Sequence, residues 1–297
     1  MKPYQSVRVM SRDGDDVRER EDSLAVEEPL EIRLQEENGG SPEAFVVTMR
    51  TPGEDEDLSA GLLFAEGVLA TPADLCSLRR SSDPRMESDM RENVLIATVR
   101  PEAVGRARAL RRSTVMGSAC GVCGRTSIDA ILPAGRPPLT SPLRVAAEVL
   151  YGLPDKLRES QSVFSRTGGL HAAALFDATG SRLAVREDIG RHNATDKLVG
   201  RLFRDGAVPA GDRILMVSGR AGFEIVQKAY NAGIPVVASV SAPSSLAVEL
   251  ADAGGVTLVG FLRERRFNVY SHSRRVLGGD PAGIGRDPKY RIPVDRS

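Results

Sequence analysis

The second half of the sequence alternates short apolar runs with amphipathic segments, and this alternation constrains the fold more than any other feature. Apolar runs at residues 213–217, 234–239 and 256–261 predict three strands. The segments 222–232 and 244–253 between them predict helices. Short connections, and strands that are apolar almost throughout, favour a largely parallel sheet with helices on its faces. The sequence therefore predicts an α/β core.

Upstream segments extend this core and add a smaller unit before it. Residues 171–177 and 182–186 predict a hairpin, and residues 192–203 predict the helix that follows it. The first half predicts a small α+β unit, with a hairpin of residues 30–34 and 44–49, a helix over 54–66 and a strand over 93–99.

The change of pattern along the chain predicts five segments. Both ends are charged or rich in Gly, Pro and Arg and lack apolar periodicity, so we expect flexible tails there. The predicted segments are a tail at 1–20, an α+β domain at 21–116, a mobile cysteine loop at 117–125, an α/β domain at 126–277 and a tail at 278–297.

Charge and cysteine content exclude several classes of protein. The 40 basic and 40 acidic residues give a formal net charge of zero, so no overall field favours nucleic acid or a membrane surface. Three cysteines in 297 residues do not make a disulfide framework, and the N-terminus does not resemble a signal peptide. No apolar run approaches the roughly 18 to 20 residues that a membrane span needs. We therefore expect a cytoplasmic protein with reduced thiols and with neither nucleic acid nor membrane as a partner.

Polar residues follow each of the three core strands. These segments, residues 218–222, 239–245 and 260–266, supply serine hydroxyls, helix-opening amides and arginines. Open α/β sheets bind ligands at the carboxyl ends of their strands, and helix N-termini with guanidinium groups suit phosphate. The ring of Phe261 suits stacking against a base. The alternative interpretation is structural, with the serines as ordinary helix caps and the arginines as a solvated turn.

The sharpest chemical signal is a Cys-x-x-Cys pair, Cys120 and Cys123, in which a glycine follows each cysteine. Glycine permits tightly turned backbone, so the two thiols fit an exposed loop. A sulfur carrier needs an accessible thiolate that accepts sulfane sulfur, and often a second thiol nearby. Arg125, and Arg111 with Arg112 upstream, would stabilise the thiolate and so lower the thiol pKa. A thiol-disulfide oxidoreductase or redox sensor that uses the same pair is the leading alternative.

Zinc binding is a third interpretation of this pair. One Cys-x-x-Cys supplies two ligands where a structural site needs four, and His171, His192 and His272 lie far away in the sequence. The zinc-deaminase order of His-x-Glu before Pro-Cys-x-x-Cys is absent, because Ala-Ala follows His171 and the cysteine pair comes earlier. We therefore predict no metal site, and a zinc-stabilised nucleotide-binding regulator is the weaker alternative. Cys76 is expected to be packed or idle.

Seven segments of the sequence match the motifs of one known family, in the family's order. They are residues 23–30, 120–124 (Cys-Gly-Val-Cys-Gly), 167–174 (Thr-Gly-Gly-Leu-His-Ala-Ala-Ala), 186–198 (opening Arg-Glu-Asp-Ile-Gly-Arg-His-Asn), 218–220, 241–249 and 257–270. On these segments the chain resembles the formate dehydrogenase accessory sulfurtransferase (FdhD) family.

The resemblance implies both a function and a fold. It implies that the protein takes persulfide sulfur from a cysteine desulfurase and passes it to the molybdenum bis(molybdopterin guanine dinucleotide) cofactor of formate dehydrogenase, bound as substrate. It implies that Cys120 carries the persulfide and that Cys123 assists. The family's larger domain is similar to cytidine deaminase, so a three-layer domain of that type, with a mixed, largely parallel sheet, is implied beside the smaller α+β domain. Homodimerisation would fit a cofactor with two guanine nucleotides, by analogy alone.

The resemblance also points to the segment after the last core strand as the contact for the guanine dinucleotide. The predicted cofactor-binding residues are Phe261, Leu262, Arg263, Glu264, Arg265 and Arg266. The chain departs from the family here, since family members often carry a glycine in this turn, where Glu264 precedes two arginines. A carboxylate would accept hydrogen bonds from a guanine edge, and the arginines would meet phosphates.

Four polar residues between the cysteine pair and the core strands have two interpretations each, and we leave them outside the predicted site. They are His171, Asp188, Arg191 and His192. In the functional interpretation they orient the cofactor or move a proton. In the structural one Asp188 accepts hydrogen bonds from loop amides, and His192 or Asn193 caps a helix.

Overall fold

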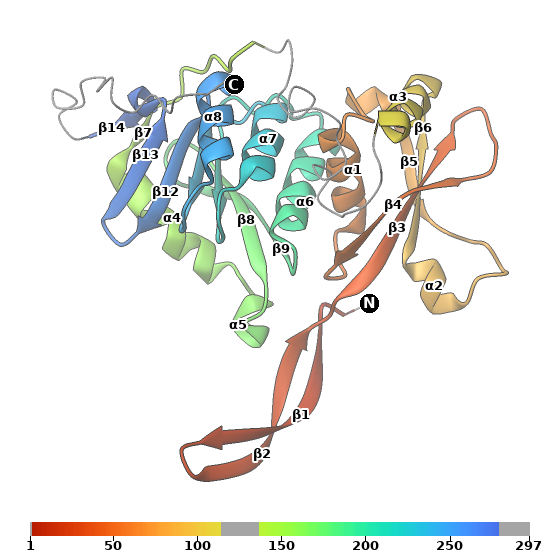
Figure 1. The fold of residues 1–297 in the computed structure, drawn as a ribbon, viewed down its shortest axis with the longest axis horizontal. Helices are drawn as coiled ribbons and strands as arrows, with labels where there is room; N and C mark the ends of the chain where they lie inside the picture. The colour runs from red at the N-terminus through yellow and green to blue at the C-terminus, as the bar shows by residue number, and fades with distance from the viewer. Residues whose placement is uncertain (1, 114–136, 279–297) are drawn as a thin grey trace, which may run out of the picture.

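The computed structural model describes residues 2–113 and 137–278 of the 297-residue chain. A large sheet with its helices lies beside a smaller sheet, and a long hairpin projects away from both (Figure 1). No helix within these described ranges is long and apolar enough to span a bilayer.

Six strands form the large sheet in the order β13-β12-β11-β10-β8-β9. The central strands β10, β11 and β12 are parallel, which confirms the predicted β-α-β-α-β order. The outer pairings are antiparallel, because β8 and β9 form the predicted hairpin and β13 returns beside β12. The sheet is therefore mixed, as predicted, but it is not largely parallel, because only its three central strands run in parallel. The bounds are β8 (His171–Phe176), β9 (Arg182–Asp188), β10 (Ile214–Val217), β11 (Val236–Ser239), β12 (Thr257–Arg263) and β13 (Arg266–Ser271), and a separate short parallel pair is formed by β7 (Val145–Ala146) and β14 (Val276–Leu277).

Helices cover both faces of this sheet: α6, α7 and α8 on one face and α4 on the other (Figure 1). Successive strand residues point to opposite faces, so Leu215 and Val217 share a core with α6 to α8, whereas Ile214 and Met216 pack with α4. Burial on both faces explains the apolar strands. The mixed α/β class is confirmed, while the likeness to cytidine deaminase stays a prediction. The bounds are α4 (Ala147–Glu159), α5 (Phe164–Thr167), α6 (Arg191–Arg204), α7 (Phe223–Asn231), α8 (Ser245–Gly254) and a 3-10 turn at Ser273–Arg275.

The smaller unit is a four-stranded sheet in the order β4-β3-β6-β5 with α1 and α3 packed on it. The antiparallel β3–β4 pair confirms the first predicted hairpin, and α1 and β6 confirm the helix and strand predicted after it. β5, α2 and α3 were not predicted. The bounds are β3 (Glu28–Glu36), β4 (Glu43–Arg50), α1 (Asp55–Ala65), a 3-10 turn at Pro72–Asp74, β5 (Leu75–Arg80), α2 (Ser88–Glu92), β6 (Val94–Val99) and α3 (Pro101–Ser113).

The two units share one hydrophobic core, because α1 of the small unit crosses α6 of the large one at two glycines. A Cβ atom on Gly61 would lie 1.9 Å from the backbone oxygen of Asp196, and one on Gly200 would lie 1.8 Å from that of Asp57. Any larger residue would collide with the opposite backbone. The rings of Phe64 and Phe203 meet nearby, with their centroids 4.9 Å apart. The backbones of the two units are therefore in direct contact at this crossing, with no space for a side chain between them.

Residues 4–25 form a hairpin, so the prediction of a tail at residues 1–20 is wrong. β1 (Tyr4–Asp13) pairs with β2 (Asp16–Ala25) along its whole length, and Gly14, with a φ of 60°, opens the two-residue turn. At the base, the guanidinium of Arg166 lies over the ring of Tyr4. Both faces of the hairpin are largely exposed, so its strands lack the apolar alternation by which a half-buried strand is recognised.

Candidate functional site

The loops that follow β10 and β11 meet the last residues of β12 at one edge of the large sheet, as predicted. Backbone hydrogen bonds join them: Val240 N donates to Val217 O at 3.4 Å, Ser244 N to Ala221 O at 3.2 Å and Phe261 N to Ser241 O at 3.1 Å. This is the carboxyl edge of the parallel strands, where open α/β sheets bind ligands.

The β8–β9 hairpin brings further polar residues to this edge. β8 runs antiparallel to β10, so its first residue, His171, lies at the carboxyl edge and pairs with Asp188, the last residue of β9. α6 then begins at the same edge with Arg191 and His192. A Cβ atom on Gly219, in the loop after β10, would lie 3.3 Å from Nδ1 of His171 and 3.9 Å from Cδ of Arg191. The loop therefore packs directly against both side chains.

We call His171, Arg191, His192 and Glu224 the edge cluster. Glu224 comes from the first turn of α7, and its Oε2 lies 2.9 Å from Nδ1 of His192. The sequence offered three of these four residues without choosing between their two roles, and Glu224 was not considered. The sequence does not show that His171 lies at this edge, because His171 reaches the carboxyl ends of the parallel strands only since β8 runs antiparallel to β10.

The edge cluster holds a positive charge that has no partner among the described residues. The side chain of Arg191 is half-buried and makes no hydrogen bond or ion pair with any residue in the described ranges, and its Nε is fully buried. Burial, and then the neighbouring Arg191 and His192, hold the pKa of His171 below its ordinary value of 6.5. Two helices, α6 and α7, also direct their N-terminal amides to this edge. An anion would find here a free guanidinium and two positive helix ends.

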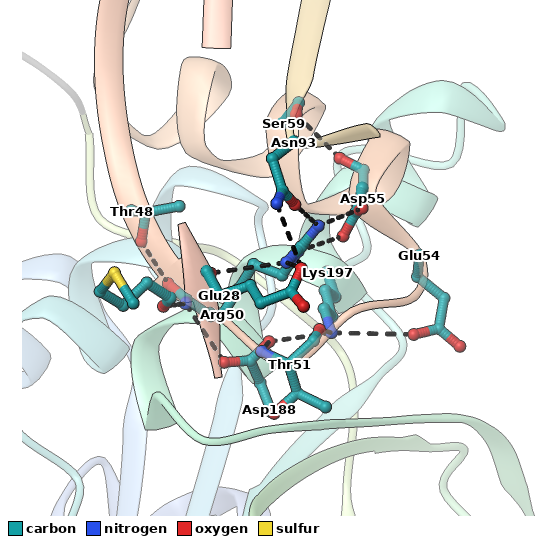
Figure 2. A network of polar contacts seen from close by, with 12 residues as sticks. Glu28, Thr48, Arg50, Thr51, Glu54, Asp55, Ser59, Asn93, Asp188 and Lys197 are labelled. Carbon is teal, nitrogen blue, oxygen red and sulfur yellow. Dashed lines mark hydrogen bonds and ion pairs between the residues drawn. The ribbon is translucent and has the colours of Figure 1, made fainter. Parts of the chain in front are cut away.

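Asp188 and Lys197 face the other way, into the contact between the two units (Figure 2). Lys197 Nζ lies 2.8 Å from Asp188 Oδ2, and both side chains are at most 1% exposed. The other carboxylate oxygen of Asp188 accepts from Gly190 N at 2.9 Å and from Asn193 Nδ2 at 3.2 Å. Thr51, in the turn between β4 and α1, adds its N–H to Asp188 and its carbonyl to Lys197. Each polar group of the ion pair is satisfied.

The structural interpretation of Asp188 is therefore supported, and one part of it is corrected. Asp188 accepts hydrogen bonds from the loop amides of Gly190 and Thr51. The expected capping by His192 or Asn193 is wrong, since the N-cap of α6 is Gly190 and no side chain caps it. Asn193 instead donates to the carbonyl of Met49 at 2.7 Å and so joins α6 to β4.

The same network continues through Arg50, which is fully buried in β4 (Figure 2). Its guanidinium binds Asp55 with two hydrogen bonds, of 2.9 and 3.1 Å, and Asn93 with a third of 2.8 Å. Burial alone would raise the pKa of Asp55, but the hydrogen bonds from Arg50 and Arg80 hold it below its ordinary value. We call this set the interunit network: Thr48, Arg50, Thr51, Asp55, Asp188, Asn193 and Lys197.

The six residues predicted to contact the cofactor occupy the end of β12 and its turn into β13. Phe261 lies at the carboxyl edge with a φ of 54°, and its side chain is partly exposed. Leu262 is fully buried in the core beneath α4, so its side chain does not reach the surface. The remaining four residues, Arg263, Glu264, Arg265 and Arg266, are exposed in the turn, and the guanidinium of Arg265 lies over the ring of Tyr151.

Cys120 and Cys123 lie outside the described residues, so the cysteine loop stays a prediction. Arg111, at the end of α3, contacts Glu43 and the carbonyl of Ala44. Cys76 is exposed on β5, so it is not packed, and slight burial together with Glu37 raises the pKa of its thiol. Among the residues that the structure describes, no group of three or more His, Cys, Asp or Glu side chains is arranged to hold a metal ion.

This fold places the chain in the class of mixed α/β proteins, with a candidate ligand site at the carboxyl edge of its sheet. Within this class, the model of the FdhD/NarQ family matches residues 25–277, so the chain belongs to that family, as its motifs predicted.

Relatives of this chain carry a common name. It is 51% identical to "Sulfur carrier protein FdhD" of Streptomyces coelicolor, over 92% of this chain and 95% of the relative. It is 49% identical to the protein of that name from Mycobacterium tuberculosis, over 91% and 97%, and 43% identical to the one from Saccharolobus solfataricus, over 86% and 91%. The crystal structure of a candidate formate dehydrogenase accessory protein from Desulfotalea psychrophila has the same fold, with a TM-score of 0.69 and 20% identity over 93% of this chain and 100% of that one.

Proposed function

We propose that this chain is a sulfur carrier in the maturation of formate dehydrogenase. Membership of the FdhD/NarQ family supports the proposal, as do relatives named as sulfur carrier proteins that match over nearly their whole lengths. In this proposal the chain acts as a sulfurtransferase, with a cysteine desulfurase as donor. The acceptor is the molybdenum bis(molybdopterin guanine dinucleotide) cofactor of formate dehydrogenase, bound as substrate.

The carrier chemistry belongs to Cys120. Its thiolate attacks the outer sulfur of the persulfide on the donor. An S–S bond forms on Cys120 while the S–S bond of the donor breaks, and the donor cysteine leaves as a thiolate that takes up a proton. Cys123, three positions along the chain, supplies the second thiol that assists sulfur release.

The observation that carries the cofactor half of the proposal is the guanidinium of Arg191, which lies at the carboxyl edge and has no partner among the residues that the structure describes. A pyrophosphate there would accept hydrogen bonds from Arg191 and from the first amides of α6 and α7. The partly exposed ring of Phe261, at the same edge, would stack on a guanine. Arg263, Arg265 and Arg266 would extend the positive surface along the β12–β13 turn, and Leu262 would contribute only backbone atoms.

Mass spectrometry tests the carrier half. The protein is incubated with a cysteine desulfurase and L-cysteine, digested without reductant, and its cysteine peptides are weighed. We expect one added sulfur atom on the peptide with Cys120, and none after Cys120→Ser. Cys76→Ser is the matched control, because Cys76 is the third cysteine of the chain, is exposed and has a raised thiol pKa. It is expected to leave loading unchanged.

Two results would overturn this half of the proposal. A reversible Cys120–Cys123 disulfide without sulfur uptake would identify a thiol-disulfide oxidoreductase. Stoichiometric zinc that is lost on Cys123→Ser would identify a zinc-stabilised protein instead.

A further inference from the structure

His192 is held in a fixed orientation at the carboxyl edge. It is the second residue of α6, and its Nδ1 lies 2.9 Å from a carboxylate oxygen of Glu224, the second residue of α7. The pair therefore joins two helix N-termini. Nε2 of His192 has no partner among the residues that the structure describes, and the side chain is 25% exposed. A carboxylate on one ring nitrogen sets the tautomer and orientation of an imidazole and leaves the other nitrogen free to exchange a proton.

A second ion pair lies one turn further along the same two helices. Asp196 of α6 lies 2.7 Å from Nζ of Lys228 of α7, and both side chains are buried. Burial alone would lower the pKa of Lys228, but Asp196, Glu66 and Glu224 raise it above its ordinary value. Lys228 therefore stays protonated. Asp196 therefore has its own cation, and Glu224 is the carboxylate that faces the imidazole of His192.

The other histidine of the edge cluster differs in this respect. His171 has no carboxylate on its ring, and burial, Arg191 and His192 hold its pKa below the ordinary value, while Asp188 opposes this only weakly. His171 is therefore neutral near pH 7. Of the two imidazoles at this edge, only that of His192 has a carboxylate within hydrogen-bond distance of a ring nitrogen among the described residues.

We propose that His192 is the proton-binding residue of the edge cluster, and that it takes up a proton when a pyrophosphate diester binds beside Arg191, with Glu224 stabilising the imidazolium. The inference rests on the proposed cofactor site and adds to it a residue whose charge follows the ligand. An anion beside the imidazole favours the charged form, and Arg191 on the same turn favours the neutral form until the anion screens it. Proton uptake and anion binding are then linked, so each strengthens the other.

Isothermal titration calorimetry measures this linkage directly. The ligand is diguanosine 5′,5′-pyrophosphate, whose phosphates carry no group that titrates between pH 5 and 8, so any proton exchanged belongs to the protein. Titrations at pH 7 in buffers of different ionisation enthalpy give the number of protons bound per ligand. For the wild-type protein we expect uptake of roughly half a proton, and an affinity that falls by up to about tenfold from pH 6 to pH 8.

Variants assign the proton. We expect His192→Gln to abolish the uptake and to flatten the dependence of affinity on pH. Glu224→Gln keeps a hydrogen-bond acceptor for Nδ1 but removes the charge, so we expect less proton uptake at pH 7 than in the wild-type protein. His272→Gln is the matched control, because His272 lies beyond β13 at the opposite edge of the sheet and contacts Asp252. It should retain the wild-type uptake.

The possible outcomes separate the two proposals. Binding without proton uptake, or uptake that survives His192→Gln and disappears with His171→Gln, overturns the assignment to His192 and leaves the cofactor site standing. If the wild-type protein binds no ligand at any pH, the cofactor site falls and the inference falls with it. If His192→Gln does not fold, Glu224→Gln still tests the inference. An unchanged dependence of affinity on pH in a folded Glu224→Gln protein would contradict it.

Discussion

Two sets of polar residues come from one short stretch of chain and differ in how completely the fold satisfies them. Asp188, Asn193 and Lys197 point into the interunit network, where their charges and amides all have partners. Arg191 and His192, the first two residues of α6, belong to the edge cluster. There the guanidinium of Arg191 and one imidazole nitrogen of His192 have no partner in the described part of the chain. Buried polar groups are normally paired, so the set without partners in the described part of the chain is the one at which we propose that a ligand binds.

The comparison also separates what each set does. The interunit network joins the turn between β4 and α1 to the start of α6, so it fixes the small unit against the large one. By the same contacts it fixes the loop that presents Arg191. The network therefore holds the two units together, and in doing so it fixes the position of Arg191 in the edge cluster.

The largest effect should come from breaking the ion pair of the network. Lys197→Met removes one partner and leaves the carboxylate of Asp188 buried without its cation, which we expect to cost about 3 to 5 kcal/mol in the free energy of unfolding. Urea denaturation measures this. Asp252→Ala is the matched control, since this exposed carboxylate meets only His272 and should change stability by under about 0.5 kcal/mol. A loss of less than about 1 kcal/mol for Lys197→Met would show that the network does not hold the two units together.

The helix crossing should respond nearly as strongly. In Gly61→Ala the added Cβ would overlap the backbone of Asp196, so α1 and α6 must move apart, and we expect a loss of about 3 kcal/mol. Gly105→Ala, in α3, meets nothing within 4 Å and should instead stabilise the protein by about 0.5 to 1 kcal/mol. Thermal unfolding compares the two. Equal and small effects would mean that the two units are free to separate at this crossing.

The edge cluster should behave in the opposite way to the network. Arg191→Met removes a charge that stabilises nothing in the described structure, so we expect stability to change by no more than about 0.5 kcal/mol. The affinity for diguanosine 5′,5′-pyrophosphate should fall by about 10- to 100-fold, because a charge-assisted contact is lost. Urea denaturation and calorimetry provide the two values. A destabilised Arg191→Met protein with unchanged affinity would reverse the roles of the two sets.

The smallest effect concerns acid stability and His171. The pKa of His171 is lower in the folded protein than in the unfolded chain, so below about pH 6.5 the unfolded chain binds more protons and stability falls as pH decreases. His171→Gln should remove this contribution. We expect the urea midpoint of the variant to fall less than that of the wild-type protein between pH 7 and pH 5. Parallel curves would show that His171 is not desolvated at the edge.

Sequence patterns predicted the central strands and helices because these elements bury one or two faces and therefore carry a clear period. The β1–β2 hairpin has no buried face, and its cross-strand pairs such as Arg8 with Glu21 look like a charged tail in the sequence. The α3 helix was missed for a similar reason, since arginines interrupt its apolar face. Hydrophobic periodicity arises from burial of one face, so it does not predict a strand or helix that is exposed on all sides.

The place where the polar strand ends converge could be predicted from the sequence, whereas several residues that lie there could not. The strand-end rule led to the loops after β10, β11 and β12. It did not lead to His171 and Glu224, which reach the edge through the antiparallel direction of β8 and through the start of α7. Leu262 was included because neighbours in sequence were treated alike, although alternate residues of a strand face opposite sides.

The central claim is that sulfur loading and cofactor binding are separate tasks of one chain, the first at Cys120 and the second at the edge cluster. The direct measurement follows isotope-labelled sulfur from a cysteine desulfurase to the protein and then to the molybdenum bis(molybdopterin guanine dinucleotide) cofactor. In the wild-type protein the label should appear on Cys120 and then on the cofactor. In Arg191→Met it should load Cys120 fully and, at a cofactor concentration below the Kd of the variant, reach the cofactor about 10- to 100-fold more slowly. Transfer by Arg191→Met at the wild-type rate, or label that never appears on Cys120, would contradict the account.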